Sequence, residues 1–310
     1  MKKFPDTILI TGAGGVLGRE LVDQLIKKEK CKIIALELSK EYLPADFFHN
    51  ERIECYDNQE WREGKLPWNK IDMIVHCAFA RSSNGRLLAE SLEFTKALFS
   101  EAVENRVSAI INISSQSVYG RSQPPLWTEN IPVSPEPPDT FYALAKYASE
   151  LLALSICNTS NSKTAVTNLR LASLSGRGMD ERLTSRFVRS ALEGEPIKLI
   201  GGQQTMAYMD VRDAADGIIA LMSTDTAKWK DVYNFGNQFR YTIKEIAEIV
   251  AEVSKKYTDN PVKIEIEKKD VHLDTGMDST LFYNDTNWIP KHDMESMIEW
   301  IFMHYTSKVE

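Results

Sequence analysis

The stretch TGAGGVLG, residues 11–18, decides the fold that the sequence predicts. It follows an apolar run at 7–11 and leads into a helical pattern over 17–28. Its glycines have GxxGxxG spacing, which suits a tight turn, a close approach of backbone to phosphate, and a helix packed hard on the strand. Free N–H groups at the helix N-terminus would meet a pyrophosphate. We therefore predict a dinucleotide-binding loop formed by Gly12, Gly15, Val16, Leu17 and Gly18.

Short apolar runs alternate with longer amphipathic ones in the first half of the chain. The candidate strands are residues 7–11, 32–38, 52–56, 73–78, 109–114 and 164–171, and the candidate helices are 17–28, 87–105 and 142–157. Strands that alternate with helices of this length indicate βαβ units and a parallel sheet. The strands are continuously apolar, as expected when helices cover both faces. The predicted fold class is α/β, a Rossmann-type doubly wound parallel sheet.

The pattern changes after Leu171, where glycines cluster and helical patterns follow at 184–193, 214–222 and 243–257. We expect a smaller, mixed C-terminal lobe that packs on the sheet. The predicted division is an NAD-binding Rossmann domain at 1–172 and a substrate-binding lobe at 173–310, with 207–236 returning to the first domain.

An acidic residue ends the second predicted strand. Glu37 stands 19 residues after Gly18, where a carboxylate can accept hydrogen bonds from both adenosine ribose hydroxyls and repel a 2′-phosphate. This favours NAD over NADP, although Lys40 lies nearby and keeps NADP as an alternative. Asp57, after the third strand, is a candidate for the adenine amino group, or else a turn-forming residue.

Composition restricts the remaining possibilities. The net charge is −7, with 37 basic and 44 acidic residues and no basic block, which argues against a nucleic-acid partner. The four cysteines have neither metal-ligand nor CxxC spacing, so we expect reduced thiols and no metal. The first apolar run is too short for a signal sequence, and no segment approaches a membrane span. We expect a soluble cytoplasmic protein with no membrane partner.

Tyr142 and Lys146 stand four positions apart in a helical pattern, so they share a face of the helix. A nearby ammonium is expected to lower the pKa of the phenol and allow proton exchange with a substrate hydroxyl near neutral pH. This spacing becomes specific only together with the glycine loop and a hydroxyl at the end of the preceding strand.

Further segments complete a pattern that covers nearly the whole chain. They are HCAFA at 76–80, SSQSVYG at 114–120, RLASLSG at 170–176, YMDVRDAA at 208–215, DSTLF at 278–282 and MIEW at 297–300. With the glycine loop, Tyr142 and Lys146, they resemble the short-chain dehydrogenase/reductase superfamily, in particular its extended branch of nucleotide-sugar epimerases, dehydratases and ketoreductases.

The resemblance implies roles for particular residues. Ser115 would hydrogen-bond the reacting oxygen, Tyr142 would move the proton, and Lys146 would also hold the nicotinamide ribose. Ala78 and Ser114 would lie beside the cofactor, and the residues expected to contact substrate are Ser115, Gln116, Ser173 and Arg177. In many relatives the helices that correspond to 87–105 and 142–157 form a homodimer interface, so we expect a homodimer.

The chain departs from the family at several positions. The 4,6-dehydratases carry an Asp-Glu pair where this chain has Gln116 and Ser117, which argues against dehydration. Ser173 replaces a frequent Asn, and Met206-Ala207 replace an Arg-Asp pair whose arginine contacts a diphosphate. Three arginines are candidates to replace that contact, although each is also explained as a surface residue: Arg177, Arg182 and Arg186.

Three functions follow from this sequence. The leading hypothesis is an NAD-dependent epimerase of a nucleotide-linked sugar, with a transient keto intermediate and Tyr142 as acid and base. Glu37 supports it, because an epimerase recycles NAD. The alternative is an NAD(P)-dependent reductase or dehydrogenase of a keto sugar or another small carbonyl, which Met206 and Ser173 favour. The third is a non-catalytic dinucleotide-binding protein, although such relatives usually lack the Tyr or the Lys.

Overall fold

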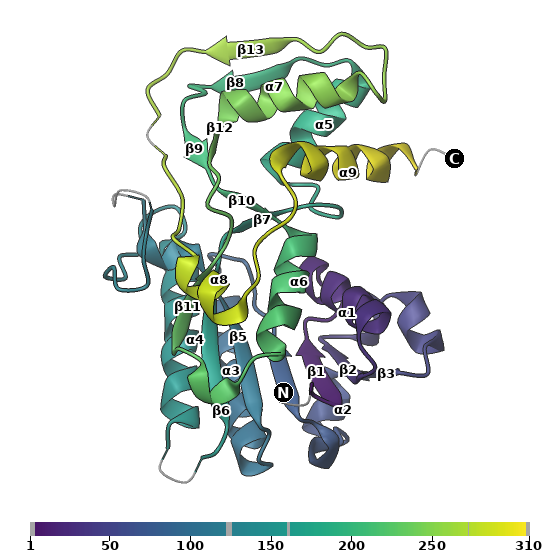
Figure 1. The fold of residues 1–310 in the computed structure, drawn as a ribbon, viewed down its shortest axis with the longest axis vertical. Helices are drawn as coiled ribbons and strands as arrows, with labels where there is room; N and C mark the ends of the chain where they lie inside the picture. The colour runs from purple at the N-terminus through teal and green to yellow at the C-terminus, as the bar shows by residue number, and fades with distance from the viewer. Residues whose placement is uncertain (1–3, 122–125, 160–161, 272, 308–310) are drawn as a thin grey trace.

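The computed structural model describes residues 4–121, 126–159, 162–271 and 273–307. The chain forms a large part built on a central sheet and a smaller part at the opposite end, which holds the C-terminal helix (Figure 1).

A seven-stranded sheet forms the centre of the large part. Its strand order is β11-β6-β5-β4-β1-β2-β3, and all neighbouring strands are parallel. The strands are β1 (Thr7–Thr11), β2 (Lys32–Glu37), β3 (Ile53–Asp57), β4 (Met73–His76), β5 (Ala109–Ser115), β6 (Ala165–Leu171) and β11 (Val232–Phe235). This order reverses between β1 and β4, the crevice where ligands bind in doubly wound sheets. The predicted Rossmann-type α/β fold is confirmed.

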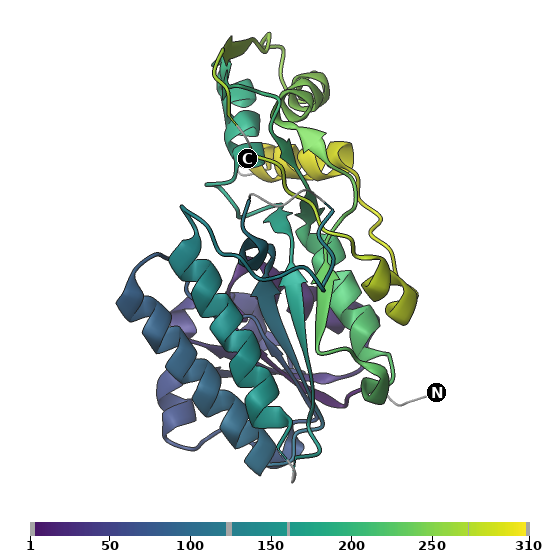
Figure 2. The ribbon, with the colours of Figure 1, turned by 90° about the vertical axis from the view of Figure 1, so that its left-hand side faces the viewer.

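Helices cover both faces of the sheet (Figure 2). They are α1 (Val16–Lys28), α2 (Asn58–Arg62), α3 (Gly85–Glu104), α4 (Thr140–Cys157) and α6 (Val211–Met222), with single 3₁₀ turns at η1 (Lys40–Tyr42), η2 (Ala45–His49), η3 (Trp68–Lys70), η4 (Gln116–Tyr119) and η5 (Thr226–Lys228). Alternate residues of β1 face opposite layers, because side chains alternate across a strand. Ile8 and Ile10 pack in the core with α1 and α6, whereas Leu9 packs in the core with α3 and α4.

The smaller part has its own apolar core. Its helices are α5 (Leu183–Glu193), α7 (Ile243–Ser254) and α9 (Met294–Thr306), which contribute Val188, Ile246 and Ile298 to that core. Three short strand pairs accompany them: β8 (Ile197–Ile200) with β13 (Ile264–Glu267), β9 (Thr205–Met206) with β12 (Tyr241–Thr242), and β7 (Ser173–Ser175) with β10 (Tyr208–Asp210). Only the β9–β12 pair is antiparallel, so the lobe is mixed as expected.

The chain returns to the large part after β10. There α6 packs against α1, β11 forms the sheet edge, and α8 (Thr280–Thr286) packs beside β11. The exact division into domains at residues 172 and 173 stays a prediction.

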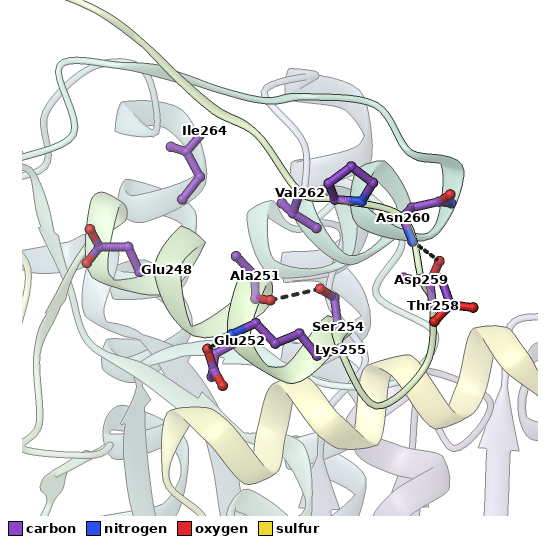
Figure 3. Close-up of a pocket in the computed structure, with 11 residues that line it drawn as sticks. Glu248, Ala251, Glu252, Ser254, Lys255, Thr258, Asp259, Asn260, Val262 and Ile264 are labelled. Carbon is purple, nitrogen blue, oxygen red and sulfur yellow. Dashed lines mark hydrogen bonds and ion pairs between the residues drawn. The ribbon is translucent and has the colours of Figure 1, made fainter.

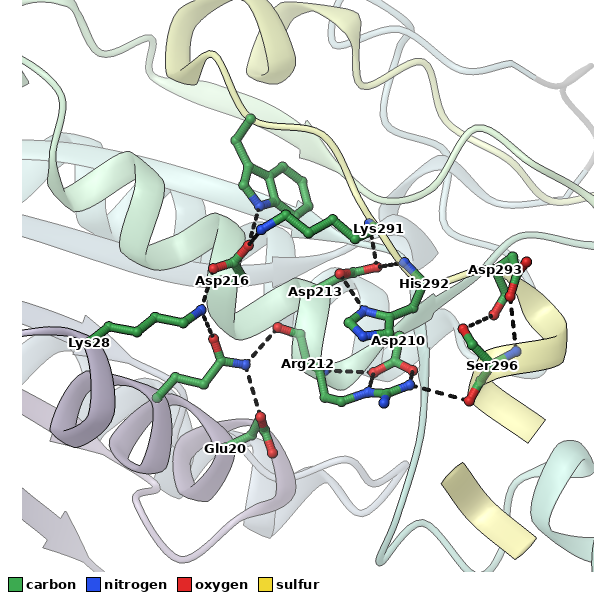
Figure 4. Close-up of polar contacts among 12 residues, drawn as sticks. Glu20, Lys28, Asp210, Arg212, Asp213, Asp216, Lys291, His292, Asp293 and Ser296 are labelled. Carbon is green, nitrogen blue, oxygen red and sulfur yellow. Dashed lines mark hydrogen bonds and ion pairs between the residues drawn. The ribbon is translucent and has the colours of Figure 1, made fainter. Parts of the chain in front are cut away.

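Two carboxylates on α6, one buried and one half-buried, anchor the segment that leads into α9 (Figure 4). Asp213 accepts hydrogen bonds from the backbone N–H of His292 at 2.9 Å and from its ring nitrogen at 2.7 Å. Asp216 accepts hydrogen bonds from Lys28, Lys291 and Trp288. Burial alone would raise the pKa of Asp216, but these donors lower it to about 2. These contacts fix the smaller part to α1 and α6.

Candidate active site

The glycine loop lies at the carboxyl end of β1. Gly12 has φ 65°, and a Cβ there would stand 2.8 Å from the backbone nitrogen of Ala78. A Cβ on Gly18 would stand 2.2 Å from the Gly12 carbonyl oxygen. Gly15 is the N-cap of α1, so the first N–H groups of the helix, from Val16 onward, point out of its N-terminus. Larger residues at Gly12 and Gly18 would separate the helix from the sheet and fill the phosphate cradle.

A cavity of about 1040 Å³ extends from this loop along the ends of β2 and β4 to α3. Gly12, Gly15, Glu37 and Ala78 line it, so four residues predicted from the sequence come together here. Phe79 and Ala80 also line it. Its size suits an extended ligand of dinucleotide size, since ligand cavities typically measure about 300–1,000 Å³.

Glu37 lies in this cavity with an unused hydrogen-bond acceptor. Oε2 is buried and has no partner among the described residues. Burial raises the pKa of the carboxyl, while backbone N–H groups of Gly14 and Leu38 act in the opposite direction. Lys40 is held 2.7 Å from Glu60, away from a role beside Glu37. A pair of ribose hydroxyls would satisfy the free oxygen, so this site fits NAD better than NADP.

The other predicted cofactor residues do not line this cavity: Val16, Leu17, Gly18, Asp57, Ser114, Tyr142 and Lys146. Asp57 caps α2 by accepting the Glu60 N–H at 2.9 Å, and its neighbour Asn58 lines the cavity instead. Ser114 donates to Glu150 at 2.5 Å and is buried below the site. Their roles in cofactor binding stay predictions, and both side chains are engaged in local structure.

Ser115 and Tyr142 meet between β5 and the first turn of α4. Their side chains are hydrogen-bonded to each other. Burial raises the pKa of Tyr142, and the groups that oppose this are Arg81, Ser115 and Arg182. The structure therefore brings the predicted hydroxyl pair together but keeps the phenol protonated at neutral pH.

Lys146 does not act on Tyr142 as the sequence led us to expect. Its ammonium donates to the carbonyl oxygen of Ile113 at 2.7 Å and lies 4.0 Å from the ring centre of Phe79. Burial lowers the pKa of Lys146 to about 7. The prediction that Lys146 lowers the Tyr142 pKa is wrong for this structure, because the ammonium of Lys146 binds the backbone carbonyl of Ile113 and not the phenol of Tyr142. The cations that act on the phenol are Arg81 and Arg182.

A second, smaller cavity of about 140 Å³ adjoins Ser115. Gln116, Ser173 and Met206 also line it. Gln116 donates through Nε2 to Ser173 Oγ at 2.9 Å, and its buried Oε1 has no partner among the described residues. Three of the four residues predicted to contact substrate are thus neighbours in one cavity.

Arg177, the fourth, is not brought to this cavity. Its guanidinium stacks 4.4 Å from the ring centre of Trp300, and the side chain is exposed. Arg182 lines the cavity, as does Arg81, whose guanidinium carbon lies 5.5 Å from the ring centre of Tyr142. Sequence reasoning missed Arg81. Its signal was its place directly after the HCAFA segment at the end of β4.

A buried polar network supports the floor of the site. Arg170 pairs with Glu150 at 2.8 Å and donates to the Tyr119 hydroxyl at 2.9 Å. Tyr119 donates in turn to Asn234 at 2.7 Å, which agrees with a structural role for this tyrosine. His76 is also structural, because both ring nitrogens are hydrogen-bonded to buried threonines and burial lowers its pKa to about 3.

Another hollow lies in the smaller part, along α7 and the segment that leads to β13 (Figure 3). The side chains around it pair locally: Lys255 with Glu252, and Ser254 with the carbonyl of Ala251 at 2.9 Å. None of the candidate catalytic groups is near it, so we place the active site at the β1–β4 crevice. In the part of the chain that the structure describes, none of the helices is long and apolar enough to span a membrane.

Comparisons with known proteins agree with this geometry. The sequence model described as the NAD dependent epimerase/dehydratase family matches residues 8–236. A dTDP-glucose 4,6-dehydratase of Streptomyces griseus is 24% identical, over 96% of this chain and 94% of the relative. A dTDP-glucose 4,6-dehydratase of an Actinoplanes species is 28% identical, but the match spans 55% of this chain and about half, 52%, of the relative.

The fold also matches solved structures. The UDP-glucose 4-epimerase of Thermotoga maritima, solved with UDP-glucose, superposes with a TM-score of 0.80 over 98% of this chain and 100% of that one, at 20% sequence identity. At this identity the likeness shows the fold alone.

Proposed function

Because the chain belongs to the NAD-dependent epimerase/dehydratase family, we propose that it is an NAD-dependent epimerase of a nucleotide-linked sugar. The observation that carries the proposal is the hydrogen-bonded Ser115–Tyr142 pair, of which Ser115 lines the smaller cavity. Phe79 and Ala80 line the larger cavity, and Arg81, the next residue, lines the smaller one. A sugar hydroxyl in the smaller cavity would meet Tyr142 on one side and a bound cofactor on the other.

NAD fits the larger cavity. The glycine loop would hold the pyrophosphate, and the free oxygen of Glu37 would accept the ribose hydroxyls. When bound, NAD supplies the acceptor and donor of the hydride that is removed from the sugar carbon and returned to its other face.

The residues of the chain position the sugar and move the proton. In its minor phenolate form, which Arg81 and Arg182 favour, Tyr142 takes the proton from the reacting hydroxyl and later returns it, while Ser115 holds the oxygen in place. Lys146, with its pKa lowered to about 7 by burial, is positioned beneath the site and can carry a proton near neutral pH. Gln116 and Ser173, hydrogen-bonded to each other, offer the Gln116 oxygen to a further hydroxyl of the sugar.

Elimination of water is not part of the proposed reaction, although several relatives, including the two reported above, are 4,6-dehydratases by name. Loss of water needs an extra acid and base beside the reacting carbon, and Gln116 and Ser117 cannot act as carboxylic acids. The carboxyl groups in the smaller cavity come instead from the loop before α4: Glu136 and Asp139. Asp139 is paired with Arg121 at 3.4 Å.

A one-way reductase of a keto sugar is the second candidate. Met206 lines the smaller cavity at the position where family members often carry a diphosphate-binding arginine, and Ser173 lines it where they often carry Asn. A smaller carbonyl substrate would need neither contact.

We also propose a homodimer that forms through α3 and α4, which lie side by side on one flank of the molecule (Figure 2). Large apolar side chains are exposed along these helices: Leu87, Phe141, Leu144 and Leu151.

A cytoplasmic location is proposed as well, since all four cysteines are free thiols.

The cofactor balance tests the proposed function. Purified protein is incubated with limiting NAD⁺ and a set of UDP- and dTDP-sugars, and chromatography separates the sugar stereoisomers. We expect one sugar to interconvert over many turnovers per NAD while reduced cofactor never exceeds the amount of enzyme. Steady oxidation of NADH with a ketone substrate would instead identify the reductase.

A further inference from the structure

Two arginines lie beside the reacting phenol. Arg81 lies against the Tyr142 ring at the rim of the smaller cavity, and Arg182, at the N-cap of α5, lines the same cavity from the other lobe. Their charges are close enough that Arg81, after burial, lowers the pKa of Arg182. We call Arg81 and Arg182 the arginine pair.

The arginine pair has no anionic partner within the chain. Among the described residues neither guanidinium forms an ion pair. Asp139 is a carboxylate whose charge acts on Arg182, and it is paired with Arg121 at 3.4 Å. Glu136, the other acid of the cavity, lies against Gly120. Two guanidinium groups beside one another repel, so a cavity arranged this way favours an anion.

Further hydrogen-bond donors around the arginine pair also favour an anionic ligand. Tyr208, on β10, is 4% exposed, and its phenol lies close enough to both arginines for their charges to act on it. Burial raises the pKa of Tyr208, which keeps its hydroxyl a donor. The donors near this point are therefore two guanidinium groups and two phenols, those of Tyr142 and Tyr208.

We infer, on the basis of the proposed function, that the sugar itself carries a carboxylate beside its reacting carbon and that the arginine pair binds it. A cavity of about 140 Å³ is smaller than the about 300–1,000 Å³ of cavities that hold whole ligands, so its size suits a sugar ring better than a complete nucleotide sugar. An anion within it therefore belongs to the sugar and not to the diphosphate. A carboxylate also matches the planar, two-donor fork of a guanidinium.

Paired substrates test this inference. UDP-glucuronate and UDP-glucose share their nucleotide and differ at one carbon, where the first carries a carboxylate. Binding of each, and of UDP alone, is measured by titration with NAD⁺ present, and turnover is measured in parallel. The variants are Arg81→Gln and Arg182→Gln. Arg186→Gln is the matched control, because Arg186 is exposed on the same helix as Arg182 and does not line the cavity.

We expect the wild type to bind the acidic sugar at least about tenfold more tightly than the neutral one, as loss of one charged contact would imply. Arg81→Gln and Arg182→Gln should lose this preference and keep their affinity for UDP and NAD⁺, which also shows that they are folded. Arg186→Gln should behave as the wild type.

Three results overturn the inference. Equal or better use of the neutral sugar by the wild type overturns it alone and leaves the epimerase standing. A loss of affinity for UDP in Arg182→Gln, equal to the loss for both sugars, places that arginine on the diphosphate. Failure of the wild type to bind these two sugars or any of the UDP- and dTDP-sugars of the turnover experiment overturns the proposed function as well.

Discussion

Replacement of Lys146 by methionine should make the cofactor-free protein more stable at neutral and acidic pH. The Lys146 side chain is 3% exposed, and burial lowers its pKa from 10.5 to about 7. The pKa falls by about 3.5, and each pKa unit corresponds to about 1.36 kcal/mol. The charged form of Lys146 is therefore about 5 kcal/mol less favourable in the folded protein than in the unfolded one. Methionine keeps the length of the side chain but leaves the carbonyl of Ile113 without its donor, at a loss of about 1 kcal/mol.

The way in which the free energy of unfolding changes with pH follows from the number of protons that each state binds. Between pH about 7 and 10.5 the unfolded chain keeps the Lys146 proton that the folded chain has lost, so wild-type stability rises with pH over this range. The variant lacks this rise. We expect Lys146→Met to be more stable by about 4 kcal/mol below pH 7, and the difference to fall toward about zero near pH 10.

Urea unfolding of both proteins at several pH values, without NAD, measures this difference. Lys96→Met is the control, because Lys96 is exposed on α3. The control should show no pH-dependent difference from the wild type. Parallel stability profiles for Lys146→Met and the wild type would refute the reasoning, since they would mean that Lys146 keeps its ordinary pKa in the fold.

Three further substitutions test other parts of the site. Tyr142→Phe should lower kcat by about a hundredfold or more and leave NAD binding intact, because it removes the proton path and not the cofactor cavity; rate measurements with a parallel NAD titration check this. Glu37→Gln should reduce the preference for NAD over NADP by about tenfold in Kd, and an unchanged ratio would show that Glu37 does not meet the ribose. Glu150→Gln leaves the buried charge of Arg170 unpaired and should lower the free energy of unfolding by about 3 to 5 kcal/mol, and a loss below about 1 kcal/mol in urea unfolding would contradict this.

The central sheet could be predicted because its strands are buried on both faces. A continuous apolar run such as the one in β1 has few other stable environments, and the glycines that follow it meet close backbone contacts at Gly12 and Gly18. The short strands of the smaller part could not be found in this way. β9 and β12 have two residues each, which is too short to show a periodicity in hydrophobicity. Their pairing also joins segments 35 positions apart, so the local sequence does not predict it.

The roles of the candidate site residues stay predictions, and only some of their contacts could be foreseen. The resemblance to a family predicted that Ser115 and Tyr142 act together, and the structure places their side chains in contact. The spacing on a helix predicts that Lys146 and Tyr142 share a face. It does not predict which acceptor the flexible ammonium of Lys146 will bind once it is buried. In the structure that acceptor is the carbonyl oxygen of Ile113. Arg81 lies in a loop, where no periodicity exists, and only the three-dimensional structure places it beside Tyr142.

The mass of the product formed in heavy water tests the proposed epimerase most directly. An epimerase returns the hydrogen that it removed to the same carbon, so the second stereoisomer should have the mass of the substrate, with no deuterium bound to carbon. Loss of one water would identify a dehydratase, and a change of two hydrogens would identify a reductase or dehydrogenase. Either mass change, or deuterium on the reacting carbon, would contradict the role proposed for Tyr142 and its bound cofactor.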